Sequence, residues 1–241
     1  MATNQEAKDR ISDYLGQAYE QEETRVVPKR PDLTFGNTTK KIKHAVVLYV
    51  DMRKSKKILS DASTFWSVKI HKAFLSALTH CVECRDGHMR SFNGDGIMAF
   101  FVGENAASRA VRAAMDTKGF VYAINEMLEA HSKNPVDFGI GIAQGQIMVA
   151  KSGKAGDDYT KQDLIWVGLP VYVAVELSEF GKNPENIWIS NKVRSSIEKE
   201  DYLSVVYTDS IPKTSKWNQY TKNLKSVGEY DVRATAWRSD I

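Results

Sequence analysis

Two aspartates stand where a carboxylate can be held in place for chemistry. Asp51 follows the apolar run AVVLYV, and Asp95 lies inside the turn sequence NGDG. The glycines of that turn permit the positive φ angles of a tight hairpin, which leaves the Asp95 carboxylate at the hairpin tip. An aspartate in such a turn is commonly only a turn former. Paired with Asp51 it can instead bind Mg²⁺ or Mn²⁺, because Mg²⁺ needs only one or two protein carboxylates beside substrate phosphates.

A basic segment follows the first aspartate. Residues 52–57 read MRKSKK and lie between the apolar run and a predicted helix. A positive loop before a helix is a natural phosphate site, although a plain solvated loop has the same composition. Two metal ions beside such a loop lower the pKa of an attacking hydroxyl and neutralise a leaving pyrophosphate. With no Walker motif and no evident Ser-His-Asp arrangement, the pattern favours metal-assisted phosphoryl or nucleotidyl transfer.

The elements that position these residues follow from the spacing of apolar side chains. Continuous β-branched runs predict buried strands, and apolar residues at helical spacing predict helices. Strands are predicted at residues 44–51, 89–102 (a hairpin), 136–149 (a strand pair with glycines at the bend), 163–167, 186–190, 202–207 and 228–237, and helices at 1–24, 62–84, 105–128, 168–180 and 191–198.

This order predicts an α+β sandwich in which helices cover one side of a mixed sheet with a βαββαβ core. Such a core places Asp51 and Asp95 next to each other, at the end of one strand and at the following hairpin. Residues 1–43 combine a polar helical stretch with a basic, proline-containing arm, and residues 44–241 are expected to form the catalytic domain.

Composition excludes several classes of function. The chain has 241 residues, 42% of them hydrophobic and 26% charged, and a formal charge of +3, too small to indicate a nucleic-acid-binding protein. No apolar run is long enough to span a membrane. The N-terminus is polar, without the apolar core of a signal peptide. Only two cysteines are present, which favours the reducing cytoplasm.

Those cysteines belong to a group of possible zinc ligands: His80, Cys81, Cys84 and His88. The Cys-x-x-Cys spacing suits a metal knuckle. Cys81, however, falls on the apolar face of the helix predicted at 62–84, where small buried thiols are common. We therefore expect a packed helix end rather than a zinc site.

Five segments, taken in order, resemble the catalytic domain of class III nucleotidyl cyclases over roughly residues 44–236. They read VVLYVDMRKSKKI, SFNGDGIMAFF, GIGIAQGQIMVAKSG, LIWVGLPVYVAVELSEFG and LKSVGEYDV. The resemblance implies a class III cyclase-like sandwich and a homodimer with active sites at the subunit interface. It implies two divalent cations, Mg²⁺ or Mn²⁺, at Asp51, Met52 and Asp95. It implies phosphate binding by these residues: Arg53, Lys54, Ser55, Lys56 and Lys225.

Departures from the family pattern concern the base and the transition state. Ser91 stands where adenylyl cyclases typically have Lys and guanylyl cyclases Glu, and the second base-selecting position falls near Ile165 and Trp166. Tyr172 and Glu176 fall at the family's ribose-orienting Asn and transition-state Arg. An anionic Glu cannot replace a cation beside developing negative charge.

Two interpretations account for these departures. One is a catalytically silent binding module. The other is a pyrimidine cyclase similar to the uridylate and cytidylate cyclases of bacterial Pycsar anti-phage defence, and it is favoured because both metal carboxylates and the phosphate loop are retained. Loss of the purine-reading residues, together with larger side chains, suits a smaller base. The residues expected around base and ribose are Tyr49, Ser91, Asn93, Trp166 and Tyr172.

The expected reaction is conversion of UTP, in preference to CTP, to the 3′,5′-cyclic monophosphate and pyrophosphate, in a bacterial cytoplasm. Arg53 and Arg90 are the candidates for a transition-state cation. A downstream effector that responds to the cyclic nucleotide is the implied indirect partner. The alternatives are a purine cyclase and the silent module. A polymerase-like palm also pairs two carboxylates, but the modest charge does not support a template channel.

Overall fold

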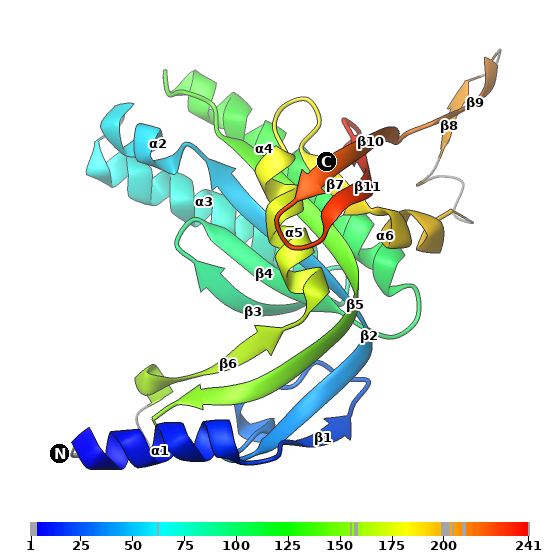
Figure 1. Cartoon of the computed structure of the whole chain (residues 1–241). Helices are drawn as coiled ribbons and strands as arrows, with labels where there is room; N and C mark the ends of the chain where they lie inside the picture. Colours follow the sequence, from blue (N-terminus) through cyan, green and yellow to red (C-terminus); the bar gives the residue numbers. More distant parts are fainter. Residues whose placement is uncertain are drawn as a thin grey trace.

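The computed structural model of the chain describes residues 4–61, 63–154, 156, 159–198, 203, 205–208 and 211–240 (Figure 1). Its helices are α1 (Asn4–Gly16), α2 (Ser55–Asp61), α3 (Thr64–Glu83), α4 (Ala106–Ala130), α5 (Leu169–Phe180) and α6 (Asn191–Ser196). Its strands are β1 (Glu20–Glu23), β2 (Thr38–Arg53), β3 (His88–Asn93), β4 (Gly96–Phe101), β5 (Asp137–Gly153), β6 (Gln162–Val167), β7 (Ile187–Ser190), β8 (Val205–Thr208), β9 (Ile211–Ser215), β10 (Asn218–Leu224) and β11 (Gly228–Thr235).

The main sheet has the strand order β10-β11-β7-β5-β2-β4-β3, with β1 added to β2 and β6 added to β5. Within it, β2, α3, β3, β4, α4 and β5 form the βαββαβ core, and β2 lies between β5 and β4. β5 and β7 are parallel, whereas the other pairs of that path run antiparallel, so the sheet is mixed. The α+β fold class predicted from the sequence is confirmed.

β5 corrects one prediction. Residues 136–149 were expected to form a strand pair with glycines at the bend, but β5 is one strand that pairs with β2 from Arg53 to Lys40. Its glycines are needed because α5 crosses their surface. A Cβ on Gly139 would overlap Ser178 O, and one on Gly141 would overlap Ala174 O. Glycine in a strand marks a close backbone approach as often as a bend.

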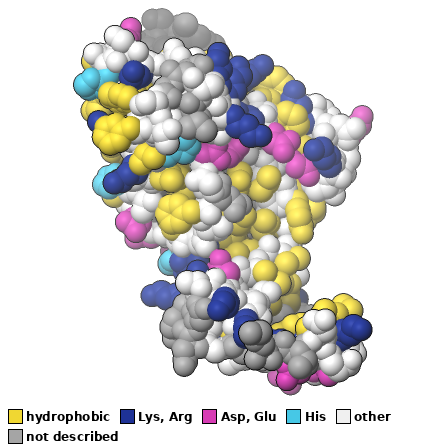
Figure 2. Space-filling view, turned by 90° about the vertical axis from the view of Figure 1, so that its left-hand side faces the viewer, with side chains coloured by type: hydrophobic (Ala, Val, Ile, Leu, Met, Phe, Trp, Pro, Cys, Tyr) yellow, Lys and Arg dark blue, Asp and Glu magenta, His cyan; other side chains and the backbone are white. Residues whose placement is uncertain are grey.

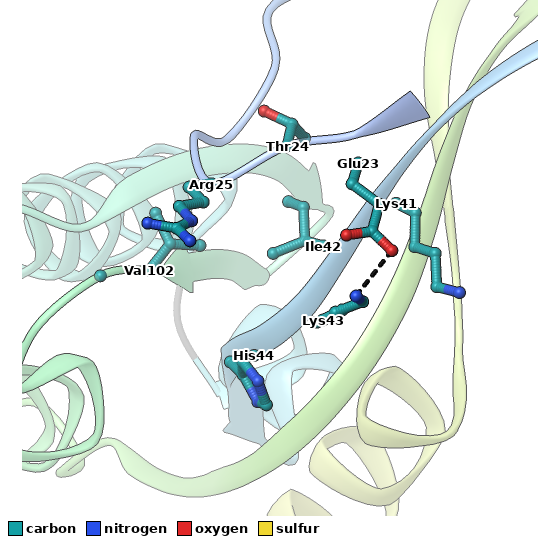
Figure 3. Close-up of a pocket in the computed structure, with 9 residues that line it drawn as sticks. Glu23, Thr24, Arg25, Lys41, Ile42, Lys43, His44 and Val102 are labelled. Atoms are coloured by element: carbon teal, nitrogen blue, oxygen red, sulfur yellow. Dashed lines mark ion pairs between the residues drawn. The ribbon is translucent and has the colours of Figure 1, made fainter. Parts of the chain in front are cut away.

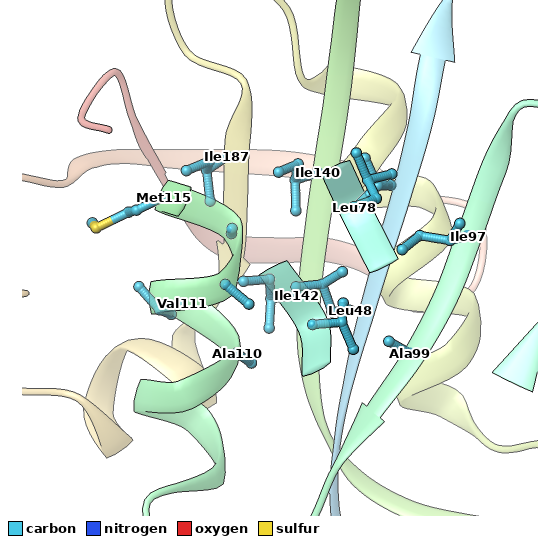
Figure 4. Packing of buried hydrophobic residues seen from close by; sticks show 14 of the residues in the cluster. Leu48, Leu78, Ile97, Ala99, Ala110, Val111, Met115, Ile140, Ile142 and Ile187 are labelled. Atoms are coloured by element: carbon cyan, nitrogen blue, oxygen red, sulfur yellow. The ribbon is translucent and has the colours of Figure 1, made fainter. Parts of the chain in front are cut away.

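Helices cover both faces of the sheet rather than one. Alternate residues of β2 such as Leu48 face α3 and α4 in the larger hydrophobic core, which contains Leu78 and Val111 (Figure 4). The intervening residues, among them Tyr49, face the second core with α5. Because β2 is central, both of its faces are buried, which is why its sequence is continuously apolar.

The N-terminal arm runs along the lower end of β2 in Figure 1. β1 pairs in parallel with β2, so β2 begins at Thr38, earlier than the predicted start at residue 44. The Arg90 guanidinium holds the arm by donating hydrogen bonds to the carbonyl oxygens of Val27 and Pro28. Among the described helices, none combines the length and the apolar character needed to cross a membrane.

Candidate functional site

The two predicted metal ligands meet at one edge of the core. Asp51 lies near the end of β2, and Asp95 lies in the β3–β4 turn, next to Gly96. The register pairs Val50 with Ile97, which brings Gly96 beside Asp51. A Cβ built on Gly96 would stand 3.0 Å from Asp51 Oδ1 and 2.8 Å from Val50 O. A side chain at position 96 would therefore crowd the Asp51 carboxylate, and glycine allows the β3–β4 turn to lie directly against it.

A second row of residues lies beside the carboxylates on the same face of the sheet. Ser91 pairs with Met98, and Met98 pairs with Tyr49. Directly paired residues of antiparallel strands point to the same face, so these three side chains adjoin one another on the α5 side. This row brings together two predicted base-pocket residues, Tyr49 and Ser91. The side chain of Asn93 lies outside the described part of the structure.

The electrostatics of the site favour a cation. Burial raises the pKa of Asp51, and the negative charges of Asp95 and Glu179 raise it further, whereas Arg53 lowers it. A raised pKa means that the ionised carboxylate is under-compensated here. In the described residues no cluster of three or more Asp, Glu, His or Cys ligands exists, so the protein would supply two carboxylates. That donor set fits Mg²⁺ or Mn²⁺ with ligands completed by substrate phosphate. Glu179 was not identified from the sequence, because only the fold brings α5 to β2.

The basic residues after Asp51 do not all lie free to bind phosphate. The Arg53 guanidinium donates to Ser178 O at 2.6 Å and to Gly181 O at 2.8 Å, at the C-terminal end of α5. Lys54 is exposed and has a left-handed backbone with φ 55°. Ser55 and Lys56 begin α2. In this arrangement Arg53 joins two elements, while Lys54 and Lys56 remain at the surface.

Lys225 lies exposed in the β10–β11 turn, far along the chain from Asp51. Glu176 of α5 binds that turn: its carboxylate accepts hydrogen bonds from the backbone N–H groups of Lys225 at 2.5 Å and Ser226 at 3.0 Å. Sequence reasoning had identified Glu176 only as a replacement for an arginine. Its partners lie so far along the chain that no local pattern reveals them.

Three other predicted residues occupy distinct surroundings. The Trp166 ring stacks on Phe100, with centroids 4.2 Å apart, on the same core face as Tyr49. Tyr172 is exposed in the first turn of α5. The Met52 side chain is buried in the opposite core, so only its backbone faces the metal end of β2. The Arg90 guanidinium donates hydrogen bonds to the N-terminal arm, as described above.

Surface cavities do not coincide with the carboxylates. A cavity of ≈ 400 Å³ lies between the arm and β2, where Glu23 pairs with Lys43 at 2.7 Å (Figure 3). Another, of ≈ 350 Å³, lies behind α2 and is lined by Arg53, Lys57 and Lys133. Neither Asp51 nor Asp95 lines these cavities or three further ones on the described surface.

The face shown in Figure 2 carries hydrophobic side chains at the narrow middle of the molecule, with acidic and basic side chains close together above them. Four of the exposed large apolar side chains lie where β6 leads into α5. They are Ile165, Val167, Leu169 and Tyr172. Exposed apolar side chains on consecutive elements are typical of an interaction surface.

Of the four possible zinc ligands, His80 and Cys81 lie in the last turn of α3, Cys84 follows that helix, and His88 begins β3. Cys81 is buried against α4, and burial raises the pKa of its thiol to about 11. Cys84 is exposed, with its sulfur 3.5 Å from His80 Nε2. A thiol with a raised pKa is a poor metal ligand, since the thiolate is the ligating form.

No protein-family model matches this chain. In sequence it is 29% identical over 192 residues to a uridylate cyclase of Burkholderia cepacia, covering 78% of this chain and 82% of the relative. It is also 29% identical over 153 residues to a uridylate cyclase of Xanthomonas perforans, covering 61% and 63%. In structure it matches the adenylyl cyclase CyaB from P. aeruginosa with a TM-score of 0.66 at 19% identity, covering 84% of this chain and 98% of that one.

At 19% identity the structural match establishes the fold, and the sequence relatives agree with it. The chain therefore has the class III nucleotidyl cyclase fold and resembles curated uridylate cyclases in sequence, which confirms both the family resemblance and the class of enzyme expected from the sequence.

Proposed function

We propose that this chain is a pyrimidine nucleotide cyclase that converts UTP, in preference to CTP, to the 3′,5′-cyclic monophosphate and pyrophosphate. The observation that carries the proposal is the pair of carboxylates, Asp51 and Asp95, which lie close enough that the negative charge of Asp95 helps raise the pKa of the half-buried Asp51. The names of the two curated relatives support uridine over other nucleosides.

In the proposed mechanism Asp51 and Asp95 would hold two divalent cations. Ions bound there would lower the pKa of the ribose 3′-hydroxyl and neutralise the leaving pyrophosphate. The 3′-hydroxyl gives up its proton to water as its oxygen attacks the α-phosphorus in line, and the bond from the α-phosphorus to the oxygen that bridges the α- and β-phosphates breaks, which releases pyrophosphate. Lys54, Lys56 and Lys225 lie exposed for contact with the departing phosphates.

The row formed by Ser91, Met98 and Tyr49 supports a small base. Two of these three side chains are large, and they stand beside the carboxylates on one face of the sheet. A purine needs more width than a pyrimidine at such a surface. Ser91 can donate to and accept from a base edge, and Asn93 at its predicted position can do the same.

The active enzyme in this proposal is a homodimer that buries the exposed apolar residues around the β6–α5 junction. One subunit supplies the metal carboxylates and the other supplies much of the base pocket. Residues 1–43 act as an arm beside the catalytic domain at 44–241. The cyclic nucleotide serves as a second messenger for a separate effector in anti-phage defence in the bacterial cytoplasm.

The test is incubation of the purified chain with each of the four nucleoside triphosphates and Mn²⁺, with chromatographic detection of cyclic products. Cyclic UMP as the main product supports the proposal, whereas cyclic AMP or GMP as the main product would establish a purine cyclase. Absence of any product at high protein concentration, with wild-type folding, sinks the enzymatic proposal.

One observation favours a catalytically silent module as the second candidate. Glu176 occupies the usual arginine position, and the guanidinium groups of Arg53 and Arg90 are both hydrogen-bonded to backbone carbonyls. The silent module predicts that Asp51→Ala and Asp95→Ala leave protection against phage unchanged. The cyclase predicts that each substitution abolishes it.

A further inference from the structure

Glu176 stands at the position where the family resemblance implies an arginine. Its negative charge would oppose phosphate binding if the side chain faced the substrate. Instead, both of its carboxylate oxygens are engaged: Oε2 accepts from the Lys225 N–H at 2.5 Å and Oε1 accepts from the Ser226 N–H at 3.0 Å. Hydrogen bonds from N–H groups to a carboxylate are stronger than neutral ones. Two such bonds to successive amides fix the backbone of this turn with respect to α5.

The rest of the turn provides weaker restraint. The Val227 N–H reaches Leu224 O at 3.4 Å, and Gly228 takes φ 77° to begin β11. Leu224 anchors the strand in the second core, where it is 1% exposed. The Ser226 hydroxyl is buried and has no hydrogen-bond partner in the described structure, so the backbone and not this side chain secures the turn.

Fixing the turn determines where the Lys225 ammonium can go. Lys225 is exposed and forms no ion pair with any described residue. A lysine on a mobile turn loses more conformational entropy on binding phosphate than one whose backbone is already ordered. The anchor therefore lowers the entropic cost of presenting this cation.

We infer that Glu176 is a positioning residue, which clamps the Lys225–Ser226 amides so that Lys225 is pre-organised for the substrate triphosphate. This inference rests on the proposed function for the role of Lys225, whereas the clamp itself rests on the two hydrogen bonds. It also accounts for an anion at the usual arginine position, because the two amides neutralise much of its charge locally.

The test compares Glu176→Gln, Lys225→Ala and the double variant. The amide of Gln keeps the shape of the side chain but places an NH₂ group against one backbone N–H, so one bond is lost. Two variants are matched controls: Ser226→Ala removes the unpartnered hydroxyl and keeps the amide, and Glu229→Gln removes an exposed charge next to the same turn.

Two kinds of measurement are made on the full chain. Hydrogen exchange of the Lys225 and Ser226 amides should accelerate about tenfold or more in Glu176→Gln and stay unchanged in Glu229→Gln. Affinity for 3′-deoxy-UTP and for tripolyphosphate with Mn²⁺, which needs no turnover, should fall about tenfold in Glu176→Gln and in Lys225→Ala. The double variant should bind no more weakly than Lys225→Ala, because one substitution removes what the other positions.

Additive losses in the double variant, or unchanged triphosphate affinity in Glu176→Gln despite faster exchange, would overturn the inference. Unchanged affinity in Lys225→Ala would also overturn it, as would a wild-type chain that binds neither probe. Failure of the proposed function is a separate outcome. If the single and double variants show the expected affinities but the wild-type chain forms no cyclic product, the chain is not a cyclase. A chain that forms cyclic UMP but shows additive losses refutes only the role of Glu176.

Discussion

Gly96 lies directly against Asp51, close enough that a Cβ on Gly96 would stand 3.0 Å from Asp51 Oδ1. The same Cβ would stand 2.8 Å from Val50 O, next to Val50–Ile97, the last pair of the β2–β4 ladder. Gly96 therefore belongs to the site although it has no side chain of its own.

Gly96→Ala should lower Mn²⁺ affinity and reduce kcat/KM for UTP by about tenfold or more, because the new methyl group crowds the Asp51 carboxylate. The measurements are Mn²⁺ titration by calorimetry and steady-state kinetics. The matched control is Gly36→Ala, since the nearest atom to a Cβ there is 4.0 Å away. Equal activity in both variants would show that the close approach of Gly96 to Asp51 does not matter for activity.

Asp51→Asn should abolish cyclase activity and stabilise the metal-free fold at pH 8. Burial and Asp95 raise the pKa of Asp51, so the folded carboxyl holds its proton more tightly than the unfolded one. Its contribution to stability is therefore present at low pH and is lost as pH rises through the folded pKa. Asn cannot ionise and avoids that loss.

The corresponding measurement is the thermal midpoint of wild type and Asp51→Asn between pH 4 and pH 8, with and without Mn²⁺. The variant's advantage should shrink towards pH 4, and Mn²⁺ should raise the midpoint of the wild type only. A variant that is less stable than wild type at pH 8 without metal contradicts the electrostatic description.

Arg53→Ala should destabilise the chain by about 2–4 kcal/mol, because two carbonyl oxygens at the end of α5 lose a charged donor. It should also raise the pKa of Asp51 further, shifting Mn²⁺ binding to higher pH. Urea unfolding and Mn²⁺ titrations over pH test the two effects. A rise in the KM for UTP with no loss of stability would instead support the phosphate-binding role predicted from the sequence.

Lys118 should make stability rise with pH above neutrality. It is 1% exposed and donates to the carbonyl oxygens of Pro184 and Ala236, and burial lowers its pKa from 10.5 to about 8. Between those values the unfolded chain binds more protons, so the free energy of unfolding increases with pH, by on the order of 3 kcal/mol over the full window.

Urea unfolding of wild type and Lys118→Met at pH 7 and pH 9.5 measures this dependence of the free energy of unfolding on pH. The wild type should gain stability relative to Lys118→Met as pH rises, and the exposed-site control Lys72→Met should behave as the wild type does. If the free energy of unfolding changes with pH in the same way in wild type and Lys118→Met, Lys118 is not the group that causes the change.

Leu169→Glu should convert the proposed homodimer to monomer and reduce activity at least tenfold. Leu169 is half-exposed at the first position of α5, where an acidic residue is favourable to the helix, so the fold should be retained. Sedimentation measures the association state. Met127→Glu, at a more exposed position on α4, is the control and should remain dimeric.

Local sequence patterns were sufficient for the βαββαβ core. The continuous apolar run before Asp51 predicts a central strand, and the turn at Asp95 predicts the hairpin whose register brings the two carboxylates together. β10 was missed because it alternates exposed and half-buried residues at the edge of the sheet, which leaves little apolar signal.

The remaining errors arise from long-range contacts. The glycines of β5 have the same sequence signature whether a strand bends or a helix lies on it, and only α5 decides between them. The partners of Arg53 and Glu176 lie on elements remote in sequence. Residue type alone assigns Arg53 to phosphate and Glu176 to no role, whereas their hydrogen bonds make both of them connectors.

The bare glycine surface of β5 has a mechanical consequence. Helix α5 rests on backbone atoms at Gly139 and Gly141, without an intervening layer of side chains that repacking or temperature could rearrange. The same helix contacts Arg53 near the metal carboxylates and, through Glu176, holds the turn of Lys225. Helix α5 thus keeps a fixed distance between Arg53 and the turn of Lys225. A substitution that lifts the helix from the sheet would displace both of them together.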